Sequence, residues 1–567
     1  IAFIEDASVP VEHLAEYIAG LTAAADELRT EMVMYAHASA GTLHVRPFIN
    51  TKDAREVRKM EELARASMEL VRGFGGSVSS EHGDGIARSW LTEPLVGREL
   101  YEVYREIKHI FDPHGVLNPN RVVDAPPMTE NLRLGPSYRT IPVVTEFDYS
   151  ADGGFAGAIE LCNGNGACRK LDSGTMCPSF MVTREEKDST RGRANALRAA
   201  ISGLIPVEEL TGERMHEVMD LCVQCKACKT ECPSNVDMAR LKSEWLSKVW
   251  DTQRMPLRTR IFANLPQIAA MVSGPAARFV NRFNSSKPFR AIAEMTLGIS
   301  ARRELPRFAR RSFVQWFGRQ KWRTEGPEVV LFPDTFANYQ HPEIAQAAAR
   351  FLDRAGYRVI VPEGFLCCGR TSLSKGLLTR AQHLALRVVE RLHPYAEAGI
   401  PIIGLEPSCI LTFRDEFLSL LPGDPRVEAV ARASETFEEF VAKRRDEPAF
   451  RALVWKGQQR NVLLHGHCHQ KALVGTVPAE QCLSLPAGYS VETVDSGCCG
   501  MAGAFGYERE HYDISLAMAE RRLAPAVRAA SGDTLIAAPG TSCRAQIADT
   551  TGRRALHPAE ILLEALA

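Results

Sequence analysis

The chain has 567 residues, more than one hydrophobic core can organise, so three to five domains are expected. Hydrophobic residues make up 45% and charged residues 24%, the ordinary balance of a globular protein. The formal net charge of -1 gives no global argument for nucleic-acid binding.

The first 125 residues alternate helical and extended patterns. Apolar residues recur at helical spacing in residues 11–29, and residues 52–73 predict a second helix. Between them, side chains alternate on both sides of a short turn in residues 31–50, which predicts a β-hairpin. Such a hairpin brings His37 and His44 together on one face.

A short polar motif follows the second helix. Residues 79–88, SSEHGDGIAR, place Glu81 and His82 beside a Gly-Asp-Gly turn. Two imidazoles and a carboxylate can form a divalent-metal site that leaves positions open for a substrate. The alternative is that each histidine is an ordinary polar residue.

These segments resemble a known enzyme family. HASAGTLH at 37–44 and SSEHGDG at 79–85 resemble the metal-binding and catalytic segments of FAD-linked 2-hydroxyacid dehydrogenases, the D-lactate, D-2-hydroxyglutarate and glycolate oxidase type. FDPHGVLNPNRV at 111–122 resembles that family's closing signature near the flavin. The first segment has Ala-Ser-Ala-Gly-Thr where the family usually has Gly-Asp-Gly-Asn between the histidines.

The resemblance covers about residues 1–123 and implies specific roles. A divalent cation, zinc or manganese, would be held by His37, His44 and Glu81. His82 would act as the general base while hydride passes to FAD. Asn118 would lie beside the flavin, and Arg46 would pair with a second carboxylate of the substrate or form a structural salt bridge. Since the flavin-binding domain of the family lies upstream, and the chain opens on an apolar run without Met, we expect it to be the C-terminal part of a longer protein that is inactive alone.

A proline-containing linker is expected at residues 126–155, followed by an all-α ferredoxin-like module at 156–245. The module contains LCVQCKACKTECP, a C-x2-C-x2-C-x3-C-P motif. Three of its thiolates, Cys222, Cys225 and Cys228, predict a [4Fe-4S] cluster, while Cys232, before proline, ligates a second cluster. A zinc site fits this spacing poorly.

The upstream half of the module is degenerate. Cys162 and Cys168 have the separation of first and third ligands, but Asn165 occupies the middle position. By the exchange rule, Cys177, which precedes a proline, joins Cys222, Cys225 and Cys228 on the complete cluster. The other cluster, held by Cys162, Cys168 and Cys232, is one thiolate short. It takes a non-Cys ligand or is a [3Fe-4S] cluster; the sequence leaves both open.

The chain has fifteen cysteines, and fourteen lie in cluster-like motifs, with Cys482 as a spare thiol. Such ligands must stay reduced, which favours the cytoplasm. No stretch reaches the eighteen or so uninterrupted apolar residues of a membrane span, and we expect no signal peptide because no basic-then-apolar run opens the chain.

Residues 246–326 are predicted to be helical and strongly basic, with interleaved aromatic residues. Such a segment can dock on an anionic membrane surface or an acidic partner, and no nucleic-acid motif accompanies it. The alternative is a basic flank packed against another domain. A helix expected at 183–203 also carries basic residues, which either offset the charge of a cluster or face solvent.

An internal repeat is expected, with the first copy at 327–425 and the second, preceded by linker helices, within 426–567; each copy alternates strands and helices. Each copy carries Cys-Cys-Gly and a later lone cysteine, 41 and 44 residues further on. The first copy has Cys367, Cys368 and Cys409. The second has Cys498, Cys499 and Cys543, and in addition Cys468 upstream.

The repeats resemble the cysteine-rich CCG repeats of heterodisulfide reductase and of the iron–sulfur subunits of glycolate oxidase, lactate utilisation and anaerobic glycerol-3-phosphate dehydrogenase. Neither copy has the five-cysteine form of that motif. In the fuller second copy, zinc, a cluster and a quinone-reducing surface all remain open.

The domain order resembles that of fused FAD and Fe–S 2-hydroxyacid dehydrogenases, with a multidomain α+β and α/β fold. We expect oxidation of a D-2-hydroxyacid to the 2-oxoacid, with electrons passing from FAD through the clusters and CCG repeats to quinone or a protein acceptor. A cytoplasmic protein, peripheral on the inner face of the membrane, fits this role, and self-association is left open. The rival hypotheses are a non-catalytic electron-transfer subunit, which has no need of the His37 and Glu81 group, and a zinc-bearing scaffold.

Overall fold

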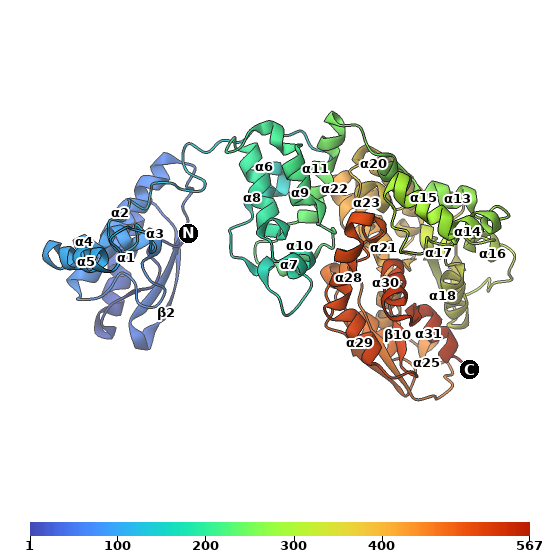
Figure 1. Cartoon of the computed structure of the whole chain (residues 1–567). Coiled ribbons are helices and arrows are strands. Elements are labelled where there is room, and N and C mark those ends of the chain that lie inside the picture. The colour runs from blue at the N-terminus through green and yellow to red at the C-terminus, as the bar shows by residue number, and fades with distance from the viewer. The chain divides into compact units, whose positions relative to one another are not determined.

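The computed structural model describes residues 1–567 and contains two compact units, residues 1–140 and 141–567 (Figure 1). None of its helices has the length and apolar character needed to cross a bilayer.

The first unit is built on a three-stranded antiparallel sheet of order β1-β3-β2. The predicted hairpin is confirmed, with β2 (Met32–His37) paired to β3 (Thr42–Pro47), and β1 (Ala7–Ser8) covers the other edge of β3. The predicted helices are α1 (Leu14–Glu27) and α2 (Ala54–Gly73). Their apolar faces share one core with β3, in which Leu21, Leu63 and Val45 are fully buried.

Shorter elements complete this unit. After α2 the chain forms α3 (Gly85–Arg88), α4 (Thr92–Val96) and α5 (Arg98–Phe111). No helix or strand is assigned between α5 and the 3-10 helix at Ser150–Asp152, a stretch that contains most of the expected linker. Met128 and Leu132 still pack on the core of the first unit, whereas Val143 packs on that of the second.

The second unit begins with helices only. They are α6 (Phe155–Glu160), α7 (Pro178–Thr183), α8 (Thr190–Ile201), α9 (Glu213–Asp220), α10 (Ala227–Glu231) and α11 (Met238–Thr252). The prediction of a single helix at 183–203 is wrong at its start, because α8 begins only at Thr190. Arg184, with a φ of 65°, ends α7 in the left-handed region, and the Ser189 hydroxyl accepts from Gly192 N to begin α8.

The basic segment is helical, as predicted. It contains α12 (Leu257–Ala263), α13 (Leu265–Val272), α14 (Ala277–Asn284), α15 (Lys287–Leu297) and α16 (Phe313–Phe317).

Two four-stranded parallel sheets follow, with the orders β5-β4-β6-β7 and β11-β10-β8-β9. The first holds β4 (Glu328–Leu331), β5 (Arg358–Ile360), β6 (Ile402–Gly404) and β7 (Ser434–Thr436). The second holds β8 (Arg460–Leu464), β9 (Tyr489–Thr493), β10 (Leu535–Ala537) and β11 (Ala555–Leu556). The internal repeat is therefore confirmed strand by strand. The fourth strand of the first sheet lies beyond residue 425, where we expected that repeat to end, because β7 pairs with β6.

The repeats pack against each other in a reciprocal way. α18 (Pro342–Arg354) of the first repeat packs on α31 (Pro558–Ala565) of the second, and α27 (Val477–Leu483) of the second packs on α24 (Phe437–Arg444) of the first. In each pair, a helix between the first and second strands of one repeat packs on the helix that follows the fourth strand of the other. At this interface His557 Nε2 donates to Leu405 O over 3.0 Å.

Candidate functional site

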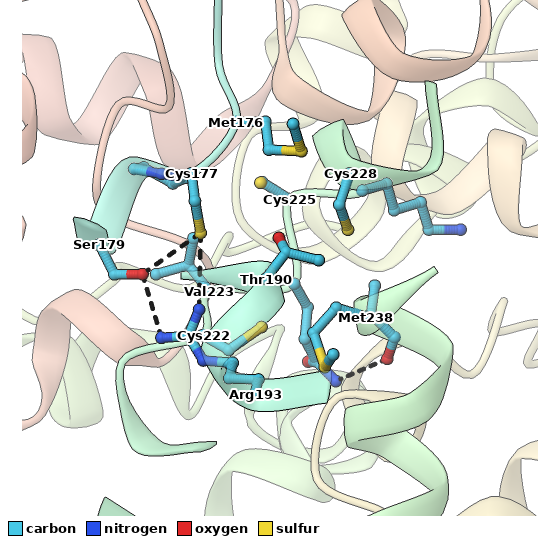
Figure 2. A pocket seen from close by; sticks show the side chains of 14 residues that line it. Met176, Cys177, Ser179, Thr190, Arg193, Cys222, Val223, Cys225, Cys228 and Met238 are labelled. Atoms are coloured by element: carbon cyan, nitrogen blue, oxygen red, sulfur yellow. Dashed lines mark hydrogen bonds between the residues drawn. The ribbon is translucent and has the colours of Figure 1, made fainter. Parts of the chain in front are cut away.

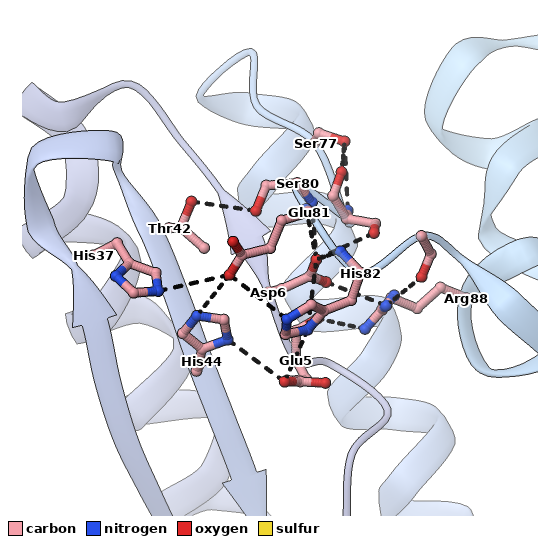
Figure 3. Close-up of polar contacts among 12 residues, drawn as sticks. Glu5, Asp6, His37, Thr42, His44, Ser77, Ser80, Glu81, His82 and Arg88 are labelled. Carbon is pink, nitrogen blue, oxygen red and sulfur yellow. Dashed lines mark hydrogen bonds and ion pairs between the residues drawn. The ribbon is translucent and has the colours of Figure 1, made fainter. Parts of the chain in front are cut away.

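The first unit gathers the four predicted site residues at one edge of the hairpin. His37 ends β2, His44 lies within β3, and Glu81 and His82 come from the loop before α3. The Nε2 atoms of His37, His44 and His82 lie 3.6, 3.1 and 3.7 Å from one oxygen of Glu81 (Figure 3). Three imidazoles from distant positions in the sequence therefore converge on a single carboxylate.

Two acidic residues that were not predicted from the sequence hold this group in place. Glu5 Oε1 lies 3.1 Å from His82 Nδ1 and 3.5 Å from His44 Nδ1. Asp6 is fully buried, and its Oδ2 accepts from the backbone N–H groups of Glu81 and His82 over 2.9 and 2.7 Å. Their only sequence signal is the pair Glu-Asp after the apolar run IAFI, with no partner nearby in the chain.

Arg46 and Asn118 are placed differently from the four. Arg46 Nη2 donates to Glu5 Oε1 over 2.7 Å, so its guanidinium is engaged in an ion pair at the edge of the histidine cluster. That ion pair keeps the pKa of Glu5 below its usual value although burial opposes this. Asn118 lies in the exposed loop after α5 with a φ of 47°.

The donor set fits a divalent cation. His37, His44 and Glu81 each offer a ligand atom, and these atoms all lie within 4.8 Å of one another. Imidazole nitrogen with carboxylate oxygen is the ligand chemistry of zinc and manganese sites, and three protein ligands leave coordination positions open.

In the second unit, four thiols line one cavity. Figure 2 shows Cys177, Cys222, Cys225 and Cys228 around it. Cys177 precedes Pro178 at the start of α7, and the other three come from the motif around α10. The loop turns tightly because Gln224 and Lys226 adopt left-handed φ angles of 51° and 63°. These are the four cysteines that the exchange rule placed together.

A buried guanidinium sits against this cavity. Arg193 of α8 is completely buried, and its Nη1 donates to Cys177 Sγ over 3.5 Å while Nη2 donates to Ser179 Oγ over 3.1 Å. Burial raises the pKa of the Cys225 and Cys228 thiols well above the usual value. Such thiols release their protons to a metal, and the fixed positive charge of Arg193 favours the thiolates that form.

The remaining cysteines of the helical module lie in the same core. Cys162, Cys168 and Cys232 are all buried there, and Arg191 N donates to Cys168 Sγ over 3.4 Å. The side chain of Asn165 is engaged in local hydrogen bonds: its Nδ2 donates to Asn163 Oδ1, and its Oδ1 accepts from Ala167 N.

In the second repeat, the cysteines meet a histidine that sequence analysis did not select. Ligand atoms of His465, Cys499 and Cys543 lie within 4.8 Å of one another. His465 Nδ1 is hydrogen-bonded to Ser496 Oγ over 2.6 Å, and its buried Nε2 has no hydrogen-bond partner. The available signal was the His-Gly-His-Cys-His run directly after β8.

Cys468 begins α26 (Cys468–Leu473) in this repeat, right after the capping residue His467. In the first repeat the equivalent place after the cap Asp334 is taken by Thr335, the first residue of α17 (Thr335–Tyr339). The first repeat therefore keeps the cysteines Cys367, Cys368 and Cys409, all buried, and has a hydroxyl in place of a fourth thiol.

The cluster loop of the helical module is anchored to both repeats. His469 Nε2 of the second repeat donates to Gln224 O over 3.0 Å. The buried Lys226 ammonium pairs with Asp415 and, at 2.5 Å, with Glu416 of the first repeat. Burial is the main cause that raises the pKa of Cys225, and the negative charge of the nearby Cys468 thiolate is the next.

Comparison with known proteins agrees with this organisation. Residues 1–122 match the C-terminal domain of FAD linked oxidases, residues 158–236 a 4Fe-4S dicluster domain, and residues 330–414 and 462–548 the cysteine-rich domain. The chain joins three known domain types. The predicted resemblance is thereby confirmed.

Curated relatives match all or part of the chain. D-2-hydroxyglutarate dehydrogenase of Escherichia coli is 28% identical over 100% of this chain and 59% of the relative, and that of Haemophilus influenzae gives the same figures. One subunit of the anaerobic glycerol-3-phosphate dehydrogenase of Escherichia coli is 29% identical over 59% of this chain and 83% of the relative. The chain thus spans about three fifths of the curated dehydrogenases that it matches.

Proposed function

We propose that this chain supplies the substrate site and the electron-transfer domains of an FAD-dependent D-2-hydroxyacid dehydrogenase. The observation that carries the proposal is the convergence of three imidazole Nε2 atoms on Glu81 in a domain of the FAD linked oxidase type. A pure electron-transfer subunit has no use for this group.

The proposed substrate site uses His37, His44 and Glu81 as ligands of zinc or manganese. When bound, the cation would hold the α-hydroxyl and carboxylate of the substrate and lower the pKa of the hydroxyl. FAD is the proposed hydride acceptor, with Asn118 beside it.

His82 is the proposed general base, and Glu5 fixes its tautomer. Because Glu5 Oε1 faces His82 Nδ1 at 3.1 Å, the proton of the neutral ring stays on Nδ1. Nε2 is then left free, on the side of Glu81, to take the hydroxyl proton. Arg46, at the edge of this group, is the proposed contact for a second substrate carboxylate, such as that of a 2-hydroxydicarboxylate.

The helical module and the second repeat form the proposed electron route. One [4Fe-4S] cluster is assigned to Cys177, Cys222, Cys225 and Cys228, and a second to Cys162, Cys168 and Cys232, in an all-α module. The contact of His469 with Gln224 supports a route from this proposed cluster to Cys468. The proposed next site on this electron-transfer route is a zinc ion or a cluster held by Cys468, Cys498, Cys499 and Cys543. His465 is an additional candidate ligand there.

D-2-hydroxyglutarate is the first substrate to test, because the relatives that match the whole chain carry that name. The proposed acceptor is a quinone or a redox protein. The second candidate is an iron–sulfur subunit serving a separate flavoprotein, which is favoured by the match to one subunit of the anaerobic glycerol-3-phosphate dehydrogenase.

The test is anaerobic purification of the complete gene product that contains this chain, with visible spectra before and after D-2-hydroxyglutarate or D-lactate. Bleaching of both flavin and Fe–S absorbance supports the dehydrogenase. The His82→Gln variant should keep both chromophores and lose bleaching by substrate while dithionite still bleaches it. An Fe–S spectrum without flavin that no hydroxyacid changes would replace the dehydrogenase by the electron-transfer subunit.

A further inference from the structure

Three consecutive helices in the second unit expose an unusual number of large apolar side chains. Figure 1 places α13, α14 and α15 together at one edge of the unit. The exposed fractions of these side chains range from 38% to 77%. The residues, hereafter the α13–α15 surface, are Met271, Phe279, Phe283, Phe289, Ile292 and Met295.

On α14 and α15, the exposed apolar side chains lie on the faces opposite those that bind one segment, residues 303–308. On α14, Asn281 Oδ1 accepts from Phe308 N over 2.8 Å, and on α15, Arg290 Nη1 donates to Arg303 O over 3.2 Å. The inner faces of α14 and α15 therefore lie on residues 303–308. Their outer faces point away from it, with Phe279 and Phe283 four residues apart on one stripe.

Positive charge accompanies the apolar side chains. Arg278 and Arg282 directly precede the two phenylalanines of α14, and Lys287 begins α15; all three are exposed. No acidic residue occurs between Asp251 and Glu294. A helix face with exposed aromatic residues flanked by basic side chains has the composition of a segment that lies in the interface of an anionic bilayer.

Other occupants match less well. Two copies of the α13–α15 surface facing each other would bring the basic residues together, with Glu294 as the single acidic residue on these helices. An acidic protein would satisfy the arginines but would also need a pocket for six protruding apolar side chains. A lipid surface meets both demands, because the apolar side chains enter the acyl boundary while arginine and lysine contact phosphate groups.

We propose that the α13–α15 surface binds the surface of an anionic lipid bilayer. This binding does not depend on the dehydrogenase activity. No single helix needs to cross the bilayer, because insertion of the side chains and attraction of the basic residues act together.

The experiment is co-sedimentation of the full 567-residue chain with vesicles of phosphatidylglycerol or of phosphatidylcholine. We expect binding to phosphatidylglycerol that weakens as salt rises, and at least about tenfold weaker binding to phosphatidylcholine. F279E/F283E and R278E/R282E/K287E should each weaken binding to phosphatidylglycerol at least about tenfold. Iron content and far-ultraviolet circular dichroism should match the parent chain, which shows that the variants are folded.

Two matched substitutions serve as controls. Val454 is also exposed and apolar, at 69%, and the Arg432 side chain is 73% exposed, yet both lie outside these helices. V454E and R432E should bind vesicles like the parent. The proposal is overturned if the α13–α15 variants bind as tightly as these controls, if neutral vesicles bind equally well, or if the variants instead dissolve a dimer seen by analytical ultracentrifugation without vesicles.

Discussion

At the scale of single residues, the two adjacent carboxylates Glu5 and Asp6 organise the histidine site in different ways. Asp6 fixes the backbone of the loop that carries Glu81 and His82, whereas Glu5 faces the Nδ1 atoms of His44 and His82. A carboxylate on Nδ1 leaves Nε2 as the free ring nitrogen, as in many metal-binding histidines. The charge of Glu5 therefore favours ring orientations in which the Nε2 atoms face Glu81.

Glu5→Gln tests this role. The amide has nearly the shape of the carboxylate but lacks its charge, so His44 and His82 lose the negative charge beside their Nδ1 atoms and Arg46 loses its ion pair. We expect about 10- to 100-fold weaker zinc or manganese binding, measured by titration calorimetry on the metal-free chain. Glu12→Gln, at an exposed position, is the control and should bind like the parent. Equal affinity in both variants would exclude a positioning role for Glu5.

Cys177→Ser tests the exchange of ligands between the two motifs. Because Cys177 shares its cavity with Cys222, Cys225 and Cys228, its loss should remove or convert the complete cluster. About one to four fewer irons per chain are expected, together with a changed electron paramagnetic resonance signal of the reduced protein. Cys482→Ser, at a buried thiol outside the motifs, should keep the iron content of the parent. An unchanged spectrum of Cys177→Ser would assign the fourth ligand elsewhere.

At the scale of elements, the sequence predicted what depends on local pattern. The hairpin of β2 and β3, the parallel strands of the two repeats and the grouping of Cys177 with the downstream motif follow from period-two alternation, repeat offsets and ligand spacing. Contacts made by Glu5, Asp6 and His465 were missed. Glu5 lies far before His82 in the chain, and His465 becomes a candidate ligand only because β8 and β10 are neighbours in the sheet.

His511 shows how two elements are joined by a titrating group. It lies between Asp220 at the end of α9 and Glu508 of the second repeat, at 2.7 and 2.8 Å. Although burial opposes the charge, hydrogen bonds to these carboxylates raise the pKa of His511 to about 9. The stability from this contact is therefore fully present below the unfolded pKa of about 6.5 and is lost as pH rises through about 9.

His511→Gln should reveal this dependence. We expect the parent to exceed the variant in unfolding free energy by about 2 kcal/mol near pH 6, and the difference to vanish toward pH 9.5. Urea unfolding followed by circular dichroism at several pH values measures it. His13→Gln, in an exposed pair with Glu16, should differ little from the parent at any of these pH values. A difference independent of pH would mean that packing, rather than charge, joins the elements.

At the scale of the whole molecule, the two proposed sites lie in different compact units. The proposed hydroxyacid site lies wholly in residues 1–140, and all fifteen cysteines lie in residues 141–567. Each unit has its own hydrophobic core, and the connecting stretch contributes Met128 and Leu132 to the first and Val143 to the second. The proposed hydroxyacid site and the proposed cluster ligands therefore belong to separately folded parts.

This separation predicts how the chain responds to cleavage and to metals. A protease site inserted between Arg139 and Thr140 falls between the two cores, so both fragments should stay folded after cutting. All iron and acid-labile sulfide should remain with residues 141–567.

Zinc at about 100 times its dissociation constant should stabilise residues 1–140 by about 2.7 kcal/mol and leave the unfolding of the other fragment unchanged, provided that cluster assembly is complete beforehand. Calorimetry of the two fragments measures this. Loss of iron on cutting, or a zinc response that His44→Ala does not abolish in residues 1–140, would show that the units do not hold their sites independently.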